Sequence, residues 1–329
     1  MALTGRDLIS IFDLSDPEIE AIFDLADEMA TASRRKLRAC DGALMVTLFY
    51  EPSTRTRLSF EAAMQRLGGG VLSCADARST SAAKGETIAD TVRVVESYAD
   101  IIVLRSPLEG AARVAADYAK IPVVNAGDGA HEHPTQTLLD LYTIRKEKGG
   151  LRGVKVALVG DLKHARTAHS LAYGLARFGA QISCVAPHGL ELPSRVLDRL
   201  RTHFGGEPAL YRSLDDLVTD PNTLPTSKDR QRLLTSEVMS LFEVIYVTRI
   251  QKERFGDMQE YAKVAGCYRL TKKVIEQLGR DVKIMHPLPR VDEIAMEVDG
   301  LENAIYFKQA HNGIPVRQAV LGLVVGTLK

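Results

Sequence analysis

The sequence has few cysteines, no excess of charge of either sign and no long apolar run. Its four cysteines, Cys40, Cys74, Cys184 and Cys267, lie far apart and form no C-x-x-C pair. This spacing fits neither a zinc site nor a disulfide framework, so we expect free thiols in a reducing compartment.

The charge balance argues against several classes of partner. Lys and Arg number 42, as do Asp and Glu, so the formal net charge is zero. Proteins that bind nucleic acid or membrane surfaces usually carry a basic excess, so we expect no nucleic acid and no membrane as partners. A local cluster of arginines is therefore more informative, because it is not a by-product of a basic chain.

The chain also shows no targeting or membrane-spanning pattern. No apolar stretch approaches the ~18 residues needed to span a bilayer, and the N-terminal residues lack a charged segment followed by an apolar one. We expect a soluble cytoplasmic protein, or an organellar one if an import peptide has been removed.

The pattern of apolar residues predicts an α/β fold with parallel sheets. A chain of 329 residues is long enough for two domains, and short apolar runs alternate with amphipathic stretches throughout. A helix that starts at Pro134 ends at Gly149-Gly150, where we place the domain boundary. The segment 316–328 predicts a closing helix, and the polar stretch 219–236, with Pro221 and Pro225, predicts a surface insertion.

The strongest motif is Ser53-Thr54-Arg55-Thr56-Arg57, directly after the strand predicted at 43–50. Helix N-termini carry unpaired backbone N–H groups and a partial positive charge, so they bind phosphate readily. The hydroxyls and the Arg55 guanidinium add further donors. A capped helix with two solvated arginines explains the same residues without a ligand.

A second motif, His131-Glu132-His133-Pro134-Thr135-Gln136, opens the helix that begins at Pro134. There His133 and Gln136 could polarise a carbonyl group, although a histidine that only caps the helix is the simpler explanation. The H-x-H pair alone does not predict a metal, because a site needs three or four ligands. No nucleotide-binding loop is present either, since Glu132 stands where the third glycine of a dinucleotide fingerprint belongs.

Several arginines follow predicted strands. Arg105, Arg166 and Arg249 come directly after such strands or in the turn that follows, and Gln251 lies just beyond Arg249. Ligands bind at the carboxyl ends of strands in open α/β sheets, so three guanidiniums there would suit a ligand with several negative charges. Each arginine taken singly is better explained as a surface residue.

Two further segments stand out. His286-Pro287-Leu288-Pro289-Arg290 follows the strand predicted at 282–285, and its prolines can hold the Leu288 carbonyl outward. A rigid turn that leaves a strand is the alternative. Lys84 lies in a Ser- and Ala-rich loop before another helix start and could close over an anion.

Together these motifs resemble the carbamoyltransferase superfamily. The resemblance rests on 53–57, 84–87, 133–136 and 286–290 in the expected order, and it covers nearly the whole chain. It implies two doubly wound parallel-sheet domains joined by a helix, with a C-terminal helix that returns to the first domain. Residues 1–148 and 312–329 would bind carbamoyl phosphate, and residues 149–311 would bind an amino acid. It also implies a homotrimer with active sites shared between subunits.

Within the superfamily the sequence is similar to the aspartate branch. The ornithine branch carries a cysteine in an H-C-L-P motif and an S-M-G segment, whereas here Pro287 occupies the cysteine position and S-M-G is missing. Arg166 and Arg249 would pair with the two carboxylates of aspartate. The implied reaction transfers the carbamoyl group of carbamoyl phosphate to L-aspartate, an early step of pyrimidine biosynthesis, and requires no metal and no cofactor.

The resemblance carries over to individual positions. The residues expected to act in catalysis are Arg55, Thr56, Arg105, His133 and Gln136. Those expected to bind carbamoyl phosphate are Ser53, Thr54, Arg55, Thr56, Ser81, Lys84, Arg105, His133, Gln136, Leu288 and Pro289. Those expected to bind aspartate are Lys84, Arg166, Arg249, Gln251 and Leu288. Ser81 and Lys84 would reach in from the adjacent subunit.

Two departures from the family pattern affect these assignments. His164-Ala165 stands where a Tyr-Gly pair is common, and the loop 79–84 is one residue shorter, which weakens the assignment of Ser81. Two other functions remain open: transfer to another amine acceptor such as ornithine, or a non-catalytic scaffold. A regulatory chain is a possible further partner, and 219–236 could contact it.

Overall fold

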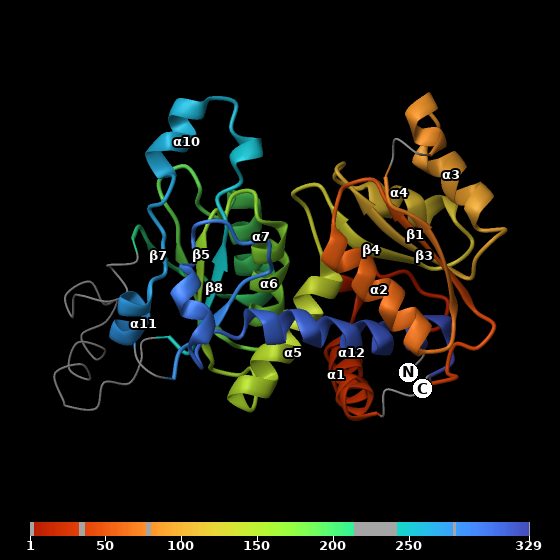
Figure 1. Cartoon of the computed structure of the whole chain (residues 1–329), viewed down its shortest axis with the longest axis horizontal. Coiled ribbons are helices and arrows are strands. Elements are labelled where there is room, and N and C mark those ends of the chain that lie inside the picture. The colour runs from red at the N-terminus through yellow and green to blue at the C-terminus, as the bar shows by residue number, and fades with distance from the viewer. Residues whose placement is uncertain (1–2, 33–36, 77–79, 214–241, 279–280, 329) are drawn as a thin grey trace. The chain divides into compact units, whose positions relative to one another are not determined.

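The structure, a computed structural model, describes residues 3–32, 37–76, 80–213, 242–278 and 281–328. The chain divides into two compact units, Met1–Tyr142 with Ala310–Lys329 (unit 1) and Thr143–Gln309 (unit 2). The division falls inside two helices, α5 (Pro134–Lys148) and α12 (Tyr306–Val325). Both helices are labelled in Figure 1. It lies earlier than Gly149 because the last turn of α5 bonds within unit 2, where Lys148 Nζ donates to the Asp281 carbonyl at 2.7 Å.

Unit 1 is built on a four-stranded parallel sheet in the order β2-β1-β3-β4. Its strands are β1 (Leu44–Phe49), β2 (Gly70–Cys74), β3 (Ile101–Ser106) and β4 (Val123–Asp128). Its helices, besides parts of α5 and α12, are α1 (Asp16–Thr31), α2 (Thr54–Arg66), α3 (Ile88–Val95) and α4 (Ala111–Tyr118), with short 3-10 turns η1 (Ile11–Asp13) and η3 (Ser81–Lys84).

Alternating residues of the unit 1 strands face two helical layers. Val46 and Leu48 of β1 pack with Val92 of α3 and Ala112 of α4. The other face carries α2 (Figure 1), whose Phe60 is fully buried. Burial on both sides explains why these strands read as continuous apolar runs.

Unit 2 contains a five-stranded parallel sheet in the order β7-β6-β5-β8-β9. Its strands are β5 (Lys155–Gly160), β6 (Gln181–Val185), β7 (Ala209–Tyr211), β8 (Val244–Thr248) and β9 (Lys283–Met285). Its other elements are α6 (Arg166–Arg177), α7 (Ser194–Phe204), α10 (Met258–Val264), α11 (Lys272–Leu278), η4 (Lys252–Arg254) and η5 (Met296–Gly300). Helices α6 and α7 lie on one side of this sheet and α11 on the other (Figure 1).

The strand order creates a topological switch point in each sheet. In unit 1 the chain moves outward from β1 to β2 on one side and from β3 to β4 on the other, and in unit 2 the corresponding neighbours are β5 and β8. Loops leave the carboxyl ends of such neighbours in opposite directions, which opens a crevice for ligands. The predicted α/β class with two parallel sheets is confirmed.

The closing helix was predicted too short. It begins at Tyr306, well before Val316, and runs through Gly313 and Pro315. Both residues are poor helix formers, but the buried faces of α12, with Val316, Val320 and other apolar residues, stabilise it by tertiary packing.

Two further points concern the extent of the chain. No helix within the described ranges is long and apolar enough to cross a membrane. The predicted insertion at 219–236 lies outside the described residues.

Candidate functional site

The first cluster of predicted residues surrounds the N-terminus of α2, beyond the end of β1. Ser53 is the N-cap with extended backbone (φ −160°, ψ 94°), and its hydroxyl makes no capping hydrogen bond to the helix. The first-turn N–H groups thus lack the usual side-chain cap and point toward any anion bound there. Thr56 is buried, whereas Thr54 and Arg55 are exposed, so two side chains remain accessible to a ligand.

Arg105 lies near the end of β3, on the other side of the unit 1 switch point. It is paired in register with Phe49 of β1, so its side chain and the α2 N-terminus belong to neighbouring strand ends. Its guanidinium is buried, donates to the Ala126 carbonyl at 3.0 Å and forms an ion pair with Glu51 at 3.3 Å. These contacts fix an always-charged group at the end of β3, next to the strand that leads to α2.

His133 and Gln136 open α5, as predicted. The His133 carbonyl accepts the N–H groups of Gln136 (3.0 Å) and Thr137 (3.1 Å), which makes His133 the residue before the first helical turn. Both site residues are buried, and Gln136 Nε2 donates to Asp140 at 2.9 Å. A buried imidazole and amide in fixed positions are suited to polarising a ligand carbonyl.

A buried carboxylate holds the turn that leads to His133. Asp128 accepts hydrogen bonds from Asn125 Nδ2 (2.9 Å), the Gly110 N–H (2.9 Å) and His131 Nδ1 (3.1 Å). Burial alone would raise the pKa of Asp128, but these hydrogen bonds lower it below the ordinary value. The hydrogen bond to Asp128 raises the pKa of His131. His131 is thus a partner of Asp128, and both side chains help to hold the turn before His133.

Ser81 and Lys84 form the two ends of η3, and both are exposed. The helix start predicted after Lys84 is confirmed, since Thr87 caps α3 by accepting the Asp90 N–H at 3.1 Å. Their exposure leaves both side chains accessible to another molecule.

In unit 2, the predicted aspartate-side residues follow β5 and β8. Arg166 is the first residue of α6, Arg249 follows β8, and Gln251 caps η4. The buried Asp161 connects the two loops, because it accepts His164 Nδ1 at 3.1 Å and the Gln251 N–H at 3.2 Å. Edge-to-face packing of His164 on Phe255, with centroids 6.3 Å apart, adds a second contact between them.

Arg249 is held in place by Glu253 of η4. Its guanidinium forms a two-bond ion pair with Glu253, in which Nη1 donates to Oε2 at 3.0 Å and Nη2 donates to Oε1. This pairing raises the pKa of Arg249 and lowers that of Glu253. The side chain keeps about 27% of its surface exposed, so one face of the cation can still bind a carboxylate.

The segment that follows β9 presents Leu288 in an unusual backbone conformation. Leu288 has a φ of 57° and a cis peptide bond to Pro289. The buried His286 supports it, because its Nδ1 accepts the Leu288 N–H at 2.8 Å and its Nε2 bonds to Glu293 at 2.7 Å. The backbone at Leu288 is thus held by a side-chain network as well as by prolines, and the outward direction of its carbonyl stays a prediction.

Three carboxylates that hold these loops were missed in the sequence analysis: Asp161, Glu293 and Asp140. Asp161 could have been found, since it directly follows Gly160 at a strand end. Asp140 could also have been found, since it lies four residues after Gln136 in the predicted helix. Glu293 carries no local signal, because folding brings it to His286. No group of three or more His, Cys, Asp or Glu side chains in the described ranges could hold a metal ion, and the predicted independence of metals stays a prediction.

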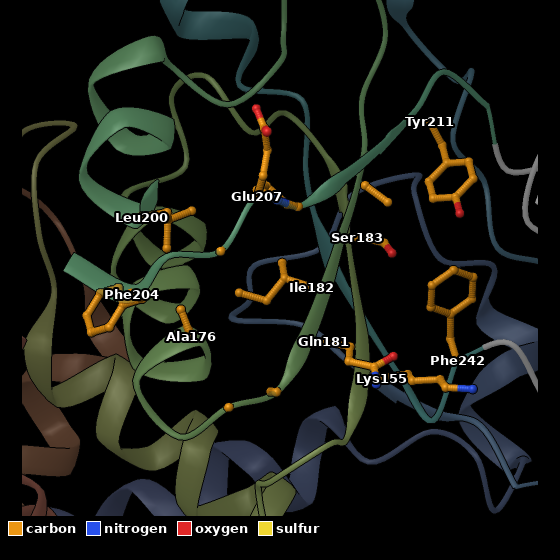
Figure 2. A pocket seen from close by; sticks show the side chains of 15 residues that line it. Lys155, Ala176, Gln181, Ile182, Ser183, Leu200, Phe204, Glu207, Tyr211 and Phe242 are labelled. Atoms are coloured by element: carbon orange, nitrogen blue, oxygen red, sulfur yellow. The ribbon is translucent and has the colours of Figure 1, made fainter. Parts of the chain in front are cut away.

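A cavity of about 420 Å³ in unit 2 lies elsewhere. It adjoins Lys155 and Gln181, the first residues of β5 and β6, and so lies at the end of the sheet opposite to Arg166 and Arg249. Figure 2 shows Leu200 and Phe204 on one side of the strands and Tyr211 and Phe242 on the other. We assign no ligand to this cavity, because most of its lining is apolar.

Comparison with known proteins follows the same division of the chain. Residues 6–146 match the family model described as "Aspartate/ornithine carbamoyltransferase, carbamoyl-P binding domain". Residues 152–324 match the model described as "Aspartate/ornithine carbamoyltransferase, Asp/Orn binding domain".

Individual relatives agree over almost their whole length. The chain is 49% identical over 327 residues to the aspartate carbamoyltransferase catalytic subunit of Methanocella arvoryzae, with 99% of each chain covered. It is 48% identical over 326 residues to that of Picrophilus torridus, with 98% of this chain and 99% of the relative covered.

Solved structures give the same result. The catalytic subunit of M. jannaschii aspartate transcarbamoylase is 48% identical, with a TM-score of 0.82 over 96% of this chain and 97% of that chain. Aspartate transcarbamoylase of Trypanosoma cruzi, in complex with N-(phosphonacetyl)-L-aspartic acid, is 36% identical, with a TM-score of 0.87 over 98% and 97% of the two chains. This chain belongs to the aspartate/ornithine carbamoyltransferase family and, within it, to the aspartate carbamoyltransferase catalytic subunits.

Proposed function

We propose that this chain transfers the carbamoyl group of carbamoyl phosphate to the amino group of L-aspartate, giving N-carbamoyl-L-aspartate and phosphate. One observation carries the proposal: each sheet has its predicted anion-binding residues at its switch point. In unit 1 these are the α2 N-terminus and Arg105, and in unit 2 they are Arg166 and Arg249.

The chemistry requires little more than positioning and charge. The aspartate amine attacks the carbamoyl carbon, the bond from that carbon to the phosphate oxygen breaks, and the leaving phosphate takes the amine proton. We infer that Ser53, Thr54, Arg55 and Thr56 bind the phosphate, and that Thr56, Arg105 and His133 stabilise the oxyanion. Fixed donors of this kind act where charge develops in the transition state.

The substrate side favours aspartate over ornithine. Two guanidiniums, of Arg166 and Arg249, would bind the two carboxylates of aspartate, with Gln251 as a further donor. A cationic ornithine side chain would be repelled there, and Glu253, which could attract it, is already paired with Arg249. Since a scaffold has no need of these arginines, we favour the transferase.

A steady-state assay with carbamoyl phosphate tests this function, using L-aspartate and L-ornithine in parallel. Rapid carbamoylation of aspartate alone supports the proposal. Turnover of ornithine alone would overturn the roles of Arg166 and Arg249, and no turnover with either acceptor would favour a scaffold.

We also propose that the chain forms a homotrimer in which Ser81 and Lys84 serve the site of a neighbouring copy. Unit 1 exposes large apolar side chains on α2, β2 and α3, namely Leu58, Leu72 and Val94, which contact with another copy could cover. Light scattering measures the mass. Mixing inactive Lys84→Ala and His133→Ala chains tests sharing, because hybrid trimers would regain activity only if a site draws on two copies.

A regulatory chain and a cytoplasmic location are two further inferences. The relatives are named catalytic subunits, which supports a partner subunit here, and copurification from the native cell tests it. The four cysteines are free thiols, which suits a reducing compartment, and cell fractionation tests the location.

A further inference from the structure

The amide of Gln136 is oriented within α5 by a buried carboxylate one turn further along. Gln136 Nε2 donates to Asp140 Oδ1 at 2.9 Å, and both side chains are buried. An ionised carboxylate accepts hydrogen bonds but donates none, so it selects the nitrogen of the amide and turns the oxygen away. Asp140 therefore determines that the oxygen of the Gln136 amide, and not its nitrogen, is available to a ligand.

A buried arginine places a positive charge that interacts with Asp140. Arg317 of α12 is only 3% exposed, and burial lowers its pKa to about 10, while the charge of Asp140 raises it. The guanidinium thus remains charged at neutral pH. Buried charges are tolerated in proteins when a charge of opposite sign lies nearby, which is the role that Arg317 and Asp140 play for each other.

Contacts with α2 fix the position of Arg317. Its Nη1 donates to Ser59 Oγ at 2.7 Å, and its guanidinium lies over the ring of Phe60, 4.8 Å from the centroid. Gly313 makes room for it, since a Cβ there would lie 2.4 Å from Nη1. Arg317 therefore connects the helix that carries the anion-binding N-terminus with the helix that carries Gln136.

We propose that Asp140, a positioning residue supported by Arg317, makes unit 1 selective for an acyl phosphate that carries an N–H donor. The inference rests on the proposed function, because it explains how Gln136 recognises the amide group of carbamoyl phosphate. An oriented Gln136 oxygen accepts from that N–H. The Gln136 oxygen gains no hydrogen bond from acetyl phosphate. That ligand has the same phosphate group but carries a methyl group where carbamoyl phosphate has its NH2 group.

The test compares three ligands on the full chain without aspartate. Calorimetry gives dissociation constants for carbamoyl phosphate, acetyl phosphate and inorganic phosphate with wild type and with Asp140→Asn. An asparagine can accept or donate, so Gln136 can take both orientations. We expect carbamoyl phosphate to bind about three- to tenfold more weakly, and the other two ligands to change by less than about twofold. The control Asp117→Asn, on the exposed surface of α4, should change none of them.

Two outcomes would overturn the inference. Equal weakening of all three ligands would mean that Asp140 only maintains the fold, and no change in any would mean that Gln136 is oriented by other contacts. If Asp140→Asn does not fold, the pair Asp140→Leu with Arg317→Met removes both charges together, which buried pairs often tolerate. That double variant should bind phosphate and lose the preference for carbamoyl phosphate over acetyl phosphate.

The wild type separates this inference from the proposed function. If it carbamoylates aspartate but binds acetyl phosphate as tightly as carbamoyl phosphate, the role of Asp140 is wrong and the function stands. If it neither binds carbamoyl phosphate nor carbamoylates aspartate, both are wrong.

Discussion

The backbone N–H of Leu288 donates a 2.8 Å hydrogen bond to Nδ1 of His286. Because Nδ1 accepts, the ring proton is on Nε2, which donates to Glu293 at 2.7 Å. Oε2 of Glu293 also accepts the N–H groups of Val291 and Asp292, both at 3.1 Å. One buried carboxylate thus determines both the tautomer of His286 and the backbone around Leu288.

This network predicts a pH-dependent contribution to stability. Burial alone would raise the pKa of Glu293, but hydrogen bonds from His286 and the backbone lower it. Because the pKa in the folded state lies below the unfolded value, the contribution is complete above the unfolded pKa and is lost as the pH falls through the folded pKa. Glu293→Gln, which places an NH2 group against two backbone donors, should lose about 1.5–3 kcal/mol at pH 7.

Urea unfolding at pH 7 and at pH 3 checks this prediction. The difference between wild type and Glu293→Gln should shrink at the lower pH, whereas the exposed control Glu302→Gln should show little effect at either. A difference that stays constant with pH would contradict the role of the ionised carboxylate.

Gly160, at the switch point of unit 2, should not tolerate a side chain. Its φ is +112°, and a Cβ would lie 2.2 Å from the Thr248 carbonyl oxygen. We expect Gly160→Ala to lower the free energy of unfolding by about 2–4 kcal/mol. Gly189→Ala is the matched control, since Gly189 also has a positive φ (+87°) but no atom within 4 Å of a Cβ, and it should cost only about 1 kcal/mol. Equal losses in thermal unfolding would rule out the clash.

Arg249→Ala should chiefly weaken aspartate binding. The guanidinium is expected to pair with a substrate carboxylate, and a hydrogen bond to a charged group contributes about 1.5–3 kcal/mol, so the KM for aspartate should rise about 10- to 100-fold. The KM for carbamoyl phosphate should change little. Saturation curves check this, with the exposed Lys272→Ala of α11 as control, and an unchanged KM for aspartate would contradict the assignment.

His133→Ala should act on turnover. A fixed donor to a developing oxyanion is worth roughly 10²–10³ in rate, so kcat should fall by that factor while carbamoyl phosphate still binds. His131→Ala is the control next to it, because His131 pairs with Asp128 at 3.1 Å and should affect kcat much less. Equal losses in both variants would indicate a general disturbance of this turn.

Local patterns were sufficient to predict most of the fold. Apolar runs predicted the strands, and Ser53 and Pro134 predicted the starts of α2 and α5. These features depend on neighbours along the chain, so a sequence shows them directly. The start of α12 was wrong because Gly313 and Pro315 lower its intrinsic helix propensity, and the packing that stabilises the helix involves distant residues.

The residue types of the candidate site could also be predicted from the sequence, but most of the side chains that hold them in place could not. Arginines and hydroxyls after strands predict anion binding because the carboxyl ends of parallel strands and helix N-termini share a known geometry. Glu293 and Arg317 show no such pattern in the sequence. Glu293 bonds to His286, 7 residues away, and Arg317 bonds to Ser59, 258 residues away.

The sequence by itself determined the family, the two parallel α/β sheets and the chemical character of each site, because motif order and apolar periodicity are local properties of the chain. Only the tertiary structure decided which distant carboxylates hold the candidate site residues. Asp161 holds the backbone of Gln251, and Glu293 acts through His286 on Leu288. The reason is physical: a buried polar group must find a partner in three dimensions, and folding alone brings these partners together.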